Sequence, residues 1–334
     1  MNDARPLLAV TLGDPAGTGP ELITRALTDP AVLAVCRPLV VGDAAVLDAA
    51  RAFTGTDARI HTVDTPEAAT FGPDRLVVLD QHNVNLAQLR RGEVQAAAGQ
   101  AAYESVVAAA RLALDGRVDG IVTSALNKAA LNAAGHAFDG HTGLLAEVCR
   151  APGATMMLVA DKLRVSHVST HVSLRQAIDR VRPERILKVL QLTHEAVQRL
   201  GVGSPKLAVA GLNPHAGEGG LFGTEEIEFI APAVAEARRR GMDVSGPHPG
   251  DTVFFRAAQG EFDGTVAMYH DQGHVAAKML GIWRGVNVTL GLPIVRTSVE
   301  HGTDFAHAGT GRGDPRSLIE ALKLGAALAR SRAR

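Results

Sequence analysis

Short apolar runs alternate with longer helix-like segments along almost the whole chain. The runs are nearly unbroken in Val, Leu, Ile and Ala, as in strands buried on both faces of a parallel sheet. They are LLAVTL (7–12), PLVVGD (38–43), RLVVLD (75–80), GIVTSA (120–125), ATMMLVA (154–160), LRVSHVS (163–169), LAVAGL (207–212), TVAMYH (265–270) and VNVTLG (286–291). This alternation predicts an α/β fold, with mostly parallel sheets that carry helices on both faces.

The length of the chain favours a large unit with a substantial core. A chain of 334 residues fits two domains or one two-lobed α/β catalytic unit spanning residues 1–334. A long amphipathic helix is expected at 180–201. Two divisions into lobes fit the sequence: a boundary near this helix, or one lobe from the middle of the chain and the other from both ends.

Charge and cysteine content exclude several classes of protein. The 34 basic and 35 acidic residues nearly cancel, so we expect no nucleic-acid partner. The two cysteines, Cys36 and Cys149, form no CxxC pair and favour a reducing cytoplasm. We find no apolar run of membrane-spanning length, and the first residues lack the pattern of a signal peptide.

Polar clusters follow the predicted strands, where ligands bind in open α/β sheets. His171, His215 and His270 each close an apolar run, and Asp251 and Asp271 lie near them in sequence. Neutral imidazole is a common ligand of divalent metals. A single histidine in such a turn is more often structural, and the spacing matches no local zinc motif. From the residues alone, a metal site and three structural histidines both stay open.

Each of the remaining polar segments fits either a functional role or a purely structural one. The turn GDPAGTGPE (13–21) suits a phosphate cradle or a simple strand-to-helix turn, and it matches no dinucleotide fingerprint. His141 and Thr142 precede a helix, where Thr142 fits an N-cap or a substrate contact. Lys128, Lys278 and Arg296 suit a phosphate or carboxylate, or a solvated surface. The glycine-rich loop within 298–322 is of a kind that can wrap a nucleotide.

Read together, these segments resemble a known family. GDPAGTGPE, DGHT, STH, GLNPHAGEGG, GDT, AMYHDQG, GVNVTLGLP and RTSVEHGT occur in this order between about residues 7 and 325. The chain is similar to the 4-hydroxythreonine-4-phosphate dehydrogenases of pyridoxine (vitamin B6) biosynthesis. The resemblance implies a fold like that of isocitrate and isopropylmalate dehydrogenases. It also implies a homodimer whose active site lies in a cleft near the partner subunit.

The resemblance assigns roles to individual residues. It implies one divalent metal (Zn, Mg, Co or Mn) and NAD, with NADP as the alternative. The metal ligands would be His171, His215 and His270, shared between two subunits. Substrate contacts would be His141, Thr142, Lys278, Asn287 and Arg296. We assign acid–base roles to Lys278, Asp251 and Asp271, and cofactor contacts to Gly13, Asp14, His301, Gly302, Thr303 and Asp314.

The implied reaction oxidises C3 of a phosphorylated four-carbon 3-hydroxy acid and releases CO2. The expected substrate is 4-(phosphooxy)-L-threonine. Gly143-Leu144-Leu145, HVSTHVSL, PGDTVF and His274 depart from the vitamin B6 enzymes. They favour the alternative branch, which converts 4-phospho-D-threonate or 4-phospho-D-erythronate to dihydroxyacetone phosphate. A cis-diol carboxylate dehydrogenase, a metal-dependent phosphatase and a non-catalytic sugar-phosphate sensor are the further alternatives.

Overall fold

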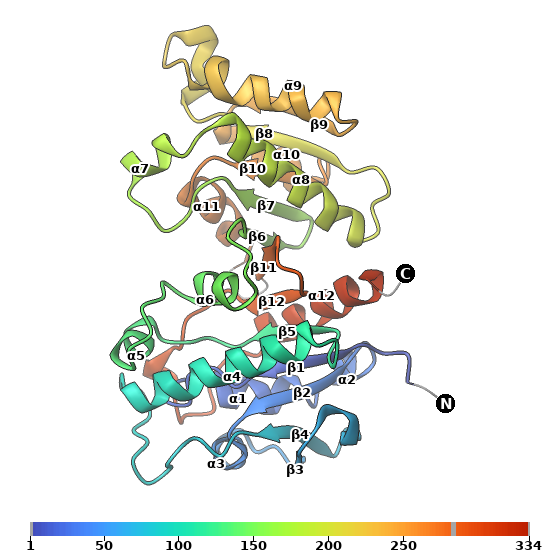
Figure 1. The fold of residues 1–334 in the computed structure, drawn as a ribbon, viewed down its shortest axis with the longest axis vertical. Coiled ribbons are helices and arrows are strands. Elements are labelled where there is room, and N and C mark those ends of the chain that lie inside the picture. The colour runs from blue at the N-terminus through green and yellow to red at the C-terminus, as the bar shows by residue number, and fades with distance from the viewer. Residues whose placement is uncertain (1–2, 282–284, 333–334) are drawn as a thin grey trace. The chain divides into compact units, whose positions relative to one another are not determined.

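Two compact units make up the part of the chain that the structure describes. A computed structural model describes residues 3–281 and 285–332. Unit 1 contains the chain up to Ala154 and from Leu292 onward, and unit 2 spans Thr155–Gly291. The middle of the chain therefore forms one unit, and both ends form the other (Figure 1).

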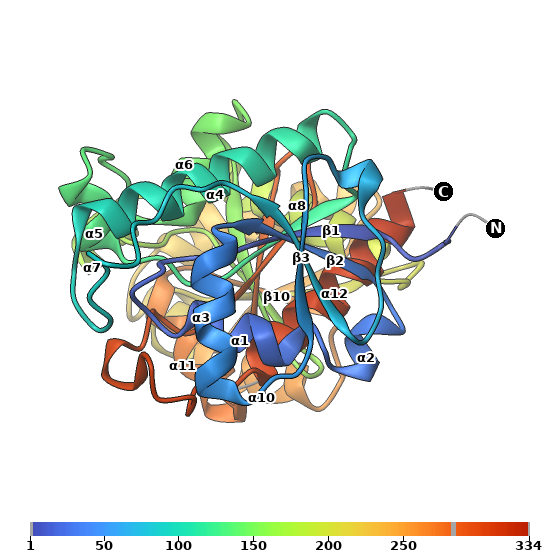
Figure 2. The same ribbon diagram turned by 90° about the horizontal axis from the view of Figure 1, so that it is seen from below.

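Unit 1 is built on parallel strands in the order β3-β4-β2-β1-β5-β12. Its strands are β1 (Leu7–Thr11), β2 (Arg37–Gly42), β3 (Arg59–Val63), β4 (Arg75–Asp80), β5 (Gly120–Thr123) and β12 (Arg296–Val299). Its helices are α1 (Gly19–Ala26), α2 (Pro30–Leu33), α3 (Ala44–Thr54), α4 (Ala96–Leu114), α5 (Lys128–Ala133), α6 (His141–Val148) and α12 (Arg316–Arg332). Short 3₁₀ turns occupy η1 (Pro66–Ala68) and η4 (Phe305–His307). Figure 2 shows α4 on one face of these strands and α1 and α12 on the other.

Unit 2 carries the strand order β11-β6-β7-β10-β8-β9. Its strands are β6 (Thr155–Ala160), β7 (Leu163–His167), β8 (Lys206–Ala210), β9 (Asp243–His248), β10 (Gly264–Ala267) and β11 (Val286–Leu290). Its helices are α7 (Leu174–Asp179), α8 (Pro183–Arg199), α9 (Ala231–Arg239), α10 (Gly250–Ala258) and α11 (His270–Gly281). Between β8 and α9 lie a 3₁₀ segment, η2 (Pro214–Gly220), and a π-helical turn, η3 (Glu226–Ile230).

The mostly parallel α/β architecture is confirmed, with a local exception in unit 2. Strands β6 and β7 pair antiparallel, as do β11 and β6. Only Asp161 and Lys162 separate β6 from β7. A parallel crossover needs about a dozen residues or more, so this two-residue link forces a hairpin.

Alternating side chains of β8 explain how unit 2 builds a core on each face of its strands. Leu207 and Val209 point into a cluster with α8 and α9. Ala208 and Ala210 point into a second cluster, to which α10 and Ala277 of α11 also contribute. The small alanines of β8 let α10 lie close to this strand.

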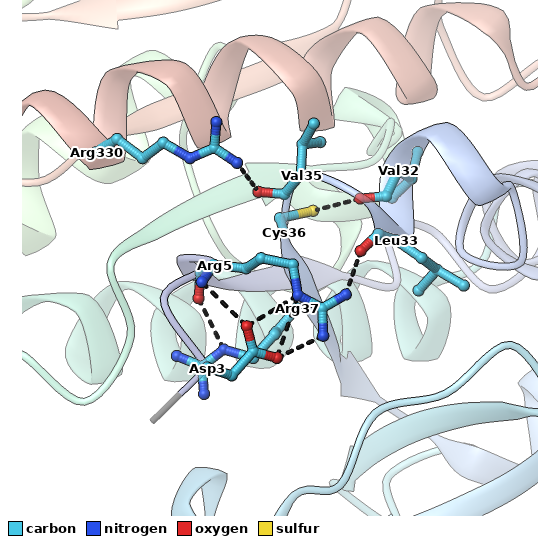
Figure 3. Close-up of polar contacts among 8 residues, drawn as sticks. All are labelled: Asp3, Arg5, Val32, Leu33, Val35, Cys36, Arg37 and Arg330. Atoms are coloured by element: carbon cyan, nitrogen blue, oxygen red, sulfur yellow. Dashed lines mark hydrogen bonds and ion pairs between the residues drawn. The ribbon is translucent and has the colours of Figure 1, made fainter. Parts of the chain in front are cut away.

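Cys36 is buried beside three arginines near the start of β1 and β2. Its Sγ donates to the carbonyl oxygen of Val32, and burial raises the pKa of the thiol to about 12 (Figure 3). The neighbouring guanidinium of Arg330 donates to a backbone carbonyl at 2.7 Å, and that of Arg37 does so at 2.8 Å. Because the thiolate is the reactive form, this cysteine is a packing residue.

Among the helices of residues 3–281 and 285–332, none is long and apolar enough to cross a bilayer.

Gly99 of α4 provides a test of how closely α4 and α5 pack. A Cβ at this position would lie 2.1 Å from the carbonyl oxygen of Ala130. Gly99→Ala should therefore lower the free energy of unfolding by about 1–3 kcal/mol, although alanine favours helix. Gly203→Ala, where a Cβ meets nothing within 4 Å, should change it by less than about 0.5 kcal/mol in urea unfolding. Equal stability of the two variants would contradict the close packing.

Candidate active site

The three candidate histidines follow three neighbouring strands. Strands β7, β10 and β8 are adjacent and parallel, with Ala267 paired to His167 and Val266 paired to Val209. Their carboxyl ends therefore share one edge of unit 2. His171 follows β7, His270 begins α11 after β10, and His215 follows β8.

His171 and His270 converge at this edge. Their ring centroids lie 5.7 Å apart. Both line a pocket of about 540 Å³, together with Ser169, Tyr269 and Asp271. His171 has a left-handed backbone, with φ of 47°, a conformation that non-glycine residues adopt rarely. Such geometry at a pocket wall is typical of a functional position.

Asp271 fixes which nitrogen of His270 is available. The Nδ1 of His270 lies 2.6 Å from a carboxylate oxygen of Asp271. A carboxylate only accepts, so Nδ1 carries the proton and Nε2 keeps its lone pair in the neutral ring. The same hydrogen bond lowers the pKa of the Asp271 carboxyl. Histidines that bind metal commonly donate their second nitrogen to a carboxylate in this way.

Two further histidines lie near His270, of which His274 stacks on its ring and His167 is tilted against His274. The ring of His274 lies 3.6 Å from that of His270 at an interplanar angle of 13°, and the His167 ring lies 4.8 Å from that of His274. Burial lowers the pKa of His167 to about 3 and that of His274 to about 4, with neighbouring imidazoles adding to both shifts. A Cβ on Gly273 would lie 2.4 Å from Nε2 of His167. This glycine therefore leaves room for His167 beside α11, and the rings of His167 and His274 stay neutral near pH 7.

His215 occupies an unusual turn and is set apart from the other two. Its φ of 53° is followed by positive φ values at Ala216, Gly217, Glu218 and Gly219. Within residues 3–281 and 285–332, the structure brings together no group of three His, Cys, Asp or Glu side chains that could hold a metal. One chain thus pairs His171 with His270 and presents His215 on the exposed turn after a neighbouring strand.

Gln272 links the ends of the central strands and was not singled out by the sequence analysis. Its Oε1 accepts from the backbone N–H of Met268, and its Nε2 donates to the carbonyl of Gly211, both at 2.7 Å. The side chain thereby ties the start of α11 to the end of β8. Only its place in the HDQG segment, next to His270, could have drawn attention to it.

Three other residues assigned from the resemblance lie in unit 2. Lys278 is exposed on α11, the helix that begins at His270. Asp251 is exposed in the first turn of α10. Asn287 lies on β11, and its Nδ2 donates to the sulfur of Met156 at 2.8 Å.

In unit 1, His141, Thr142 and Arg296 have well-defined surroundings. Arg296 is buried on β12, and its Nη2 donates to Oγ1 of Thr123 at 2.6 Å. Burial, and then the charge of Arg296, lowers the pKa of His141 well below its usual value. The N-cap interpretation of Thr142 is wrong, because Gly140 is the N-cap of α6 and has φ of 144°. Lys128 is the first residue of α5 and is exposed.

The cofactor candidates of unit 1 come from two distant segments that meet. Thr18 donates its backbone N–H to the carbonyl of Thr303 at 3.0 Å, and a Cβ on Gly17 would lie 2.8 Å from the same oxygen. Glu21, which is 3% exposed, accepts the backbone N–H of Gly309 at 2.5 Å and of Gly311 at 2.6 Å. The turn after β1 therefore holds the C-terminal loop in place. Glu21 was missed because its partners lie almost 300 positions away.

The remaining cofactor candidates differ in their surroundings. Asp14 is fully buried, its Oδ2 has no hydrogen-bond partner among the described residues, and burial raises its pKa to about 6. Gly13 precedes it with φ of 75°. The Nδ1 of His301 lies 2.8 Å from the carbonyl of Gly302. Asp314 accepts from Nε of Arg316 at 2.8 Å, and this bond lowers its pKa.

Polar side chains at the carboxyl ends of parallel strands are the layout of an α/β enzyme. The chain belongs to the family of the pyridoxal phosphate biosynthetic protein PdxA, whose family model matches residues 34–325.

Named relatives and solved structures agree with this family. The chain is 47% identical to the D-threonate 4-phosphate dehydrogenase of Cupriavidus necator over 334 residues, 100% of both chains. It is 44% identical to the 4-hydroxythreonine-4-phosphate dehydrogenase of Desulforapulum autotrophicum, over 98% of this chain and 96% of that one. A crystal structure of 4-hydroxythreonine-4-phosphate dehydrogenase from Klebsiella pneumoniae shares 45% identity with a TM-score of 0.88, covering 97% of this chain and 99% of that one. These relatives are all named as dehydrogenases.

The hold of Glu21 on the C-terminal loop yields a prediction. Glu21→Ala leaves the buried N–H of Gly311 and the half-buried N–H of Gly309 without an acceptor, so the free energy of unfolding should fall by about 1–3 kcal/mol. The amides of residues 301–314 should also exchange hydrogen faster by mass spectrometry, whereas the exposed Glu147→Ala on α6 should change neither quantity. Unchanged exchange in this loop would show that Glu21 does not hold it.

Proposed function

We propose that this protein catalyses the NAD- and divalent-metal-dependent oxidative decarboxylation of a four-carbon 3-hydroxy acid 4-phosphate. The observation that carries the proposal is the convergence of His171 and His270 at one strand edge, in a chain of the PdxA family. The relatives' names supply the dehydrogenase chemistry and the phosphorylated acid.

The histidines of unit 2 fit a divalent metal. His270 presents Nε2 because its protonated Nδ1 donates a hydrogen bond to Asp271. His171 lies beside it, and His215 of a second subunit would complete the set. When bound, a divalent metal acts as a Lewis acid that stabilises negative charge developing on substrate oxygens. Imidazole ligands suit Zn, Co or Mn, and nearby carboxylates admit Mg.

The turn after β1 and the 301–314 loop fit a nicotinamide cofactor. The close approach at Gly17 and Thr303 leaves no room for a side chain, so backbone groups line this turn. The backbone N–H groups of Gly17 and Thr18 are donated to Asp14 and Thr303, so we propose the cofactor contacts in the 301–314 loop and at Asp14. NAD, or NADP, would accept the hydride from C3 of the substrate. Asp14 contributes a buried carboxyl with an open oxygen and a raised pKa.

Substrate contacts are proposed for the residues that match the family's motifs. Arg296 is a fixed cation, since Thr123 and its strand neighbours hold it, and suits a carboxylate or phosphate. Lys278 is exposed on α11 and can move a proton to or from the substrate. Asp251, Asn287, His141 and Thr142 complete the proposed contacts.

D-threonate 4-phosphate is the substrate that we propose first. The relative with this name shares 47% identity over the whole chain, whereas the 4-hydroxythreonine-4-phosphate dehydrogenase of Desulforapulum autotrophicum shares 44%. The two substrates differ at C2, which carries a hydroxyl in one and an ammonium in the other. 4-(Phosphooxy)-L-threonine remains the second candidate.

The substrate proposal is tested by following NADH at 340 nm with a divalent metal present. We expect kcat/KM for D-threonate 4-phosphate to exceed that for 4-(phosphooxy)-L-threonine by at least about tenfold, since a pocket for a hydroxyl discriminates against a charged amine. D-erythronate 4-phosphate is assayed as a third substrate. Release of inorganic phosphate is measured with each of the three substrates. Absence of NADH with every four-carbon substrate would overturn the proposal, and phosphate release instead would support a phosphatase.

We also propose a homodimer, supported by apolar side chains exposed on unit 2. Met279 is 82% exposed, Leu221 72% and Phe255 68%. They belong to α11, the segment after η2, and α10, whose neighbours also carry the histidines. Exposed apolar surface of this kind marks an interaction site. A second copy that covers this surface could bring His215 of one subunit to His171 and His270 of the other.

The buried cysteines Cys36 and Cys149, which form no disulfide, support a cytoplasmic location.

Shared ligation predicts complementation between inactive variants. His171→Ala and His215→Ala should each be inactive alone. In mixed dimers one of the two sites keeps both histidines, so a refolded equimolar mixture should recover about a quarter of wild-type activity, given two-fold symmetry and random pairing. Mixing each variant with itself is the control. No recovery in a mixture shown to contain heterodimers would argue against ligands shared across subunits.

A further inference from the structure

The turn that carries His215 is held in a conformation that its sequence disfavours. His215 has φ 53° and ψ 28°, Ala216 has 53° and 43°, and Glu218 has 43° and 51°. Gly217 and Gly219, on either side of Glu218, also have positive φ. Side-chain-bearing residues visit this region singly, and a run of them is strained. Surrounding groups must therefore impose the turn.

Glu226 provides the main restraint. It is only 3% exposed, although it carries a carboxylate. One oxygen, Oε1, accepts the backbone N–H groups of Leu212 and Asn213, both at 2.7 Å. The other, Oε2, accepts from Nδ2 of Asn213 at 2.9 Å. A single buried carboxylate thus fixes the chain at the two residues that lead into Pro214 and His215.

The glycines of the turn make room for this carboxylate. A Cβ on Gly217 would lie 2.7 Å from Oε2 of Glu226, and one on Gly211 would lie 3.1 Å from its Oε1. Nδ2 of Asn213 also donates to Glu225 at 2.7 Å. Glu226 itself begins the π-helical turn η3, a geometry that is rare and frequent at functional sites. Residues before His215 bond to the Glu226 carboxylate, and Gly217 after His215 leaves room for it.

We propose that Glu226 is a positioning residue, which sets the His215 turn before a metal binds. This inference rests on the proposed function, in which His215 is a metal ligand. A ligand whose backbone is already fixed loses less conformational freedom on binding, so the site binds metal more tightly. Glu226 touches neither metal nor substrate in this role and acts only through residues 212–219.

The test compares variants of one short segment. Glu226→Ala removes every acceptor, and Glu226→Gln keeps Oε1 for the two N–H groups. Glu228→Ala is the matched control, since Glu228 is exposed on the same turn. Each purified full-length variant is measured for hydrogen exchange of residues 211–220 without metal, for Mn²⁺ affinity by calorimetry, and for melting temperature.

We expect Glu226→Ala to speed exchange across 211–220 and to weaken Mn²⁺ binding by about 10- to 100-fold, the usual effect of removing a group that orients a ligand. Glu226→Gln should restore most of the affinity, and Glu228→Ala should match the wild type. If Glu226→Ala does not fold, Asn213→Asp gives a second comparison: it replaces the Nδ2 donor with a carboxylate that repels Glu226, keeps the two backbone N–H groups, and should weaken Mn²⁺ binding in the same direction.

The outcomes separate the two proposals. Equal Mn²⁺ affinity in the wild type and in the variants that lose the Glu226 contacts overturns the positioning role and leaves the proposed function standing. Faster hydrogen exchange of residues 211–220 with unchanged Mn²⁺ affinity also overturns the positioning role, since the Glu226 contacts would then be structural only. A wild type that binds no divalent metal overturns the proposed metal site, and the positioning role with it.

Discussion

The parallel pairing of β7, β10 and β8 is the constraint on which the candidate site depends. It places the turns after three strands at one edge, although His171, His215 and His270 are far apart in sequence. Gln272 then joins two of these ends through the carbonyl of Gly211. Small alanines of β8 let α10 lie close to the strands, and α11 begins at His270 itself.

The chemistry of the edge follows from burial and hydrogen bonding more than from net charge. His167 and His274 stay neutral because they are buried among other imidazoles. His274 therefore stacks on His270, with His167 beside it, without repelling a cation. Asp271 directs the proton of His270 to Nδ1, and Glu226 fixes the turn of His215. A carboxylate thus orients each of these two histidines: Asp271 bonds the ring of His270, and Glu226 bonds the backbone that leads into His215.

Much of this arrangement could be predicted from sequence, because it follows from local patterns. Apolar runs marked the strands, and the polar residues after them marked the site edge. The hairpin of β6 and β7 departs from the parallel pattern because its two-residue link allows no crossover. Glu21 and Glu226 could not be found this way, since their partners are chosen by tertiary packing and not by spacing. Gly140, and not Thr142, caps α6 because its φ of 144° suits glycine.

The split of unit 1 between the two ends of the chain has a consequence for biosynthesis. Strand β5 pairs with β12, and α12 packs on β5 and β1. A ribosome therefore releases Thr155–Gly291 as a complete unit while β5 still has an open edge. The hydrogen bonds from Gly309 and Gly311 to Glu21 also form only after unit 2 has been synthesised. During synthesis, the open edge of β5 must therefore be kept from pairing with other chains until β12 emerges from the ribosome.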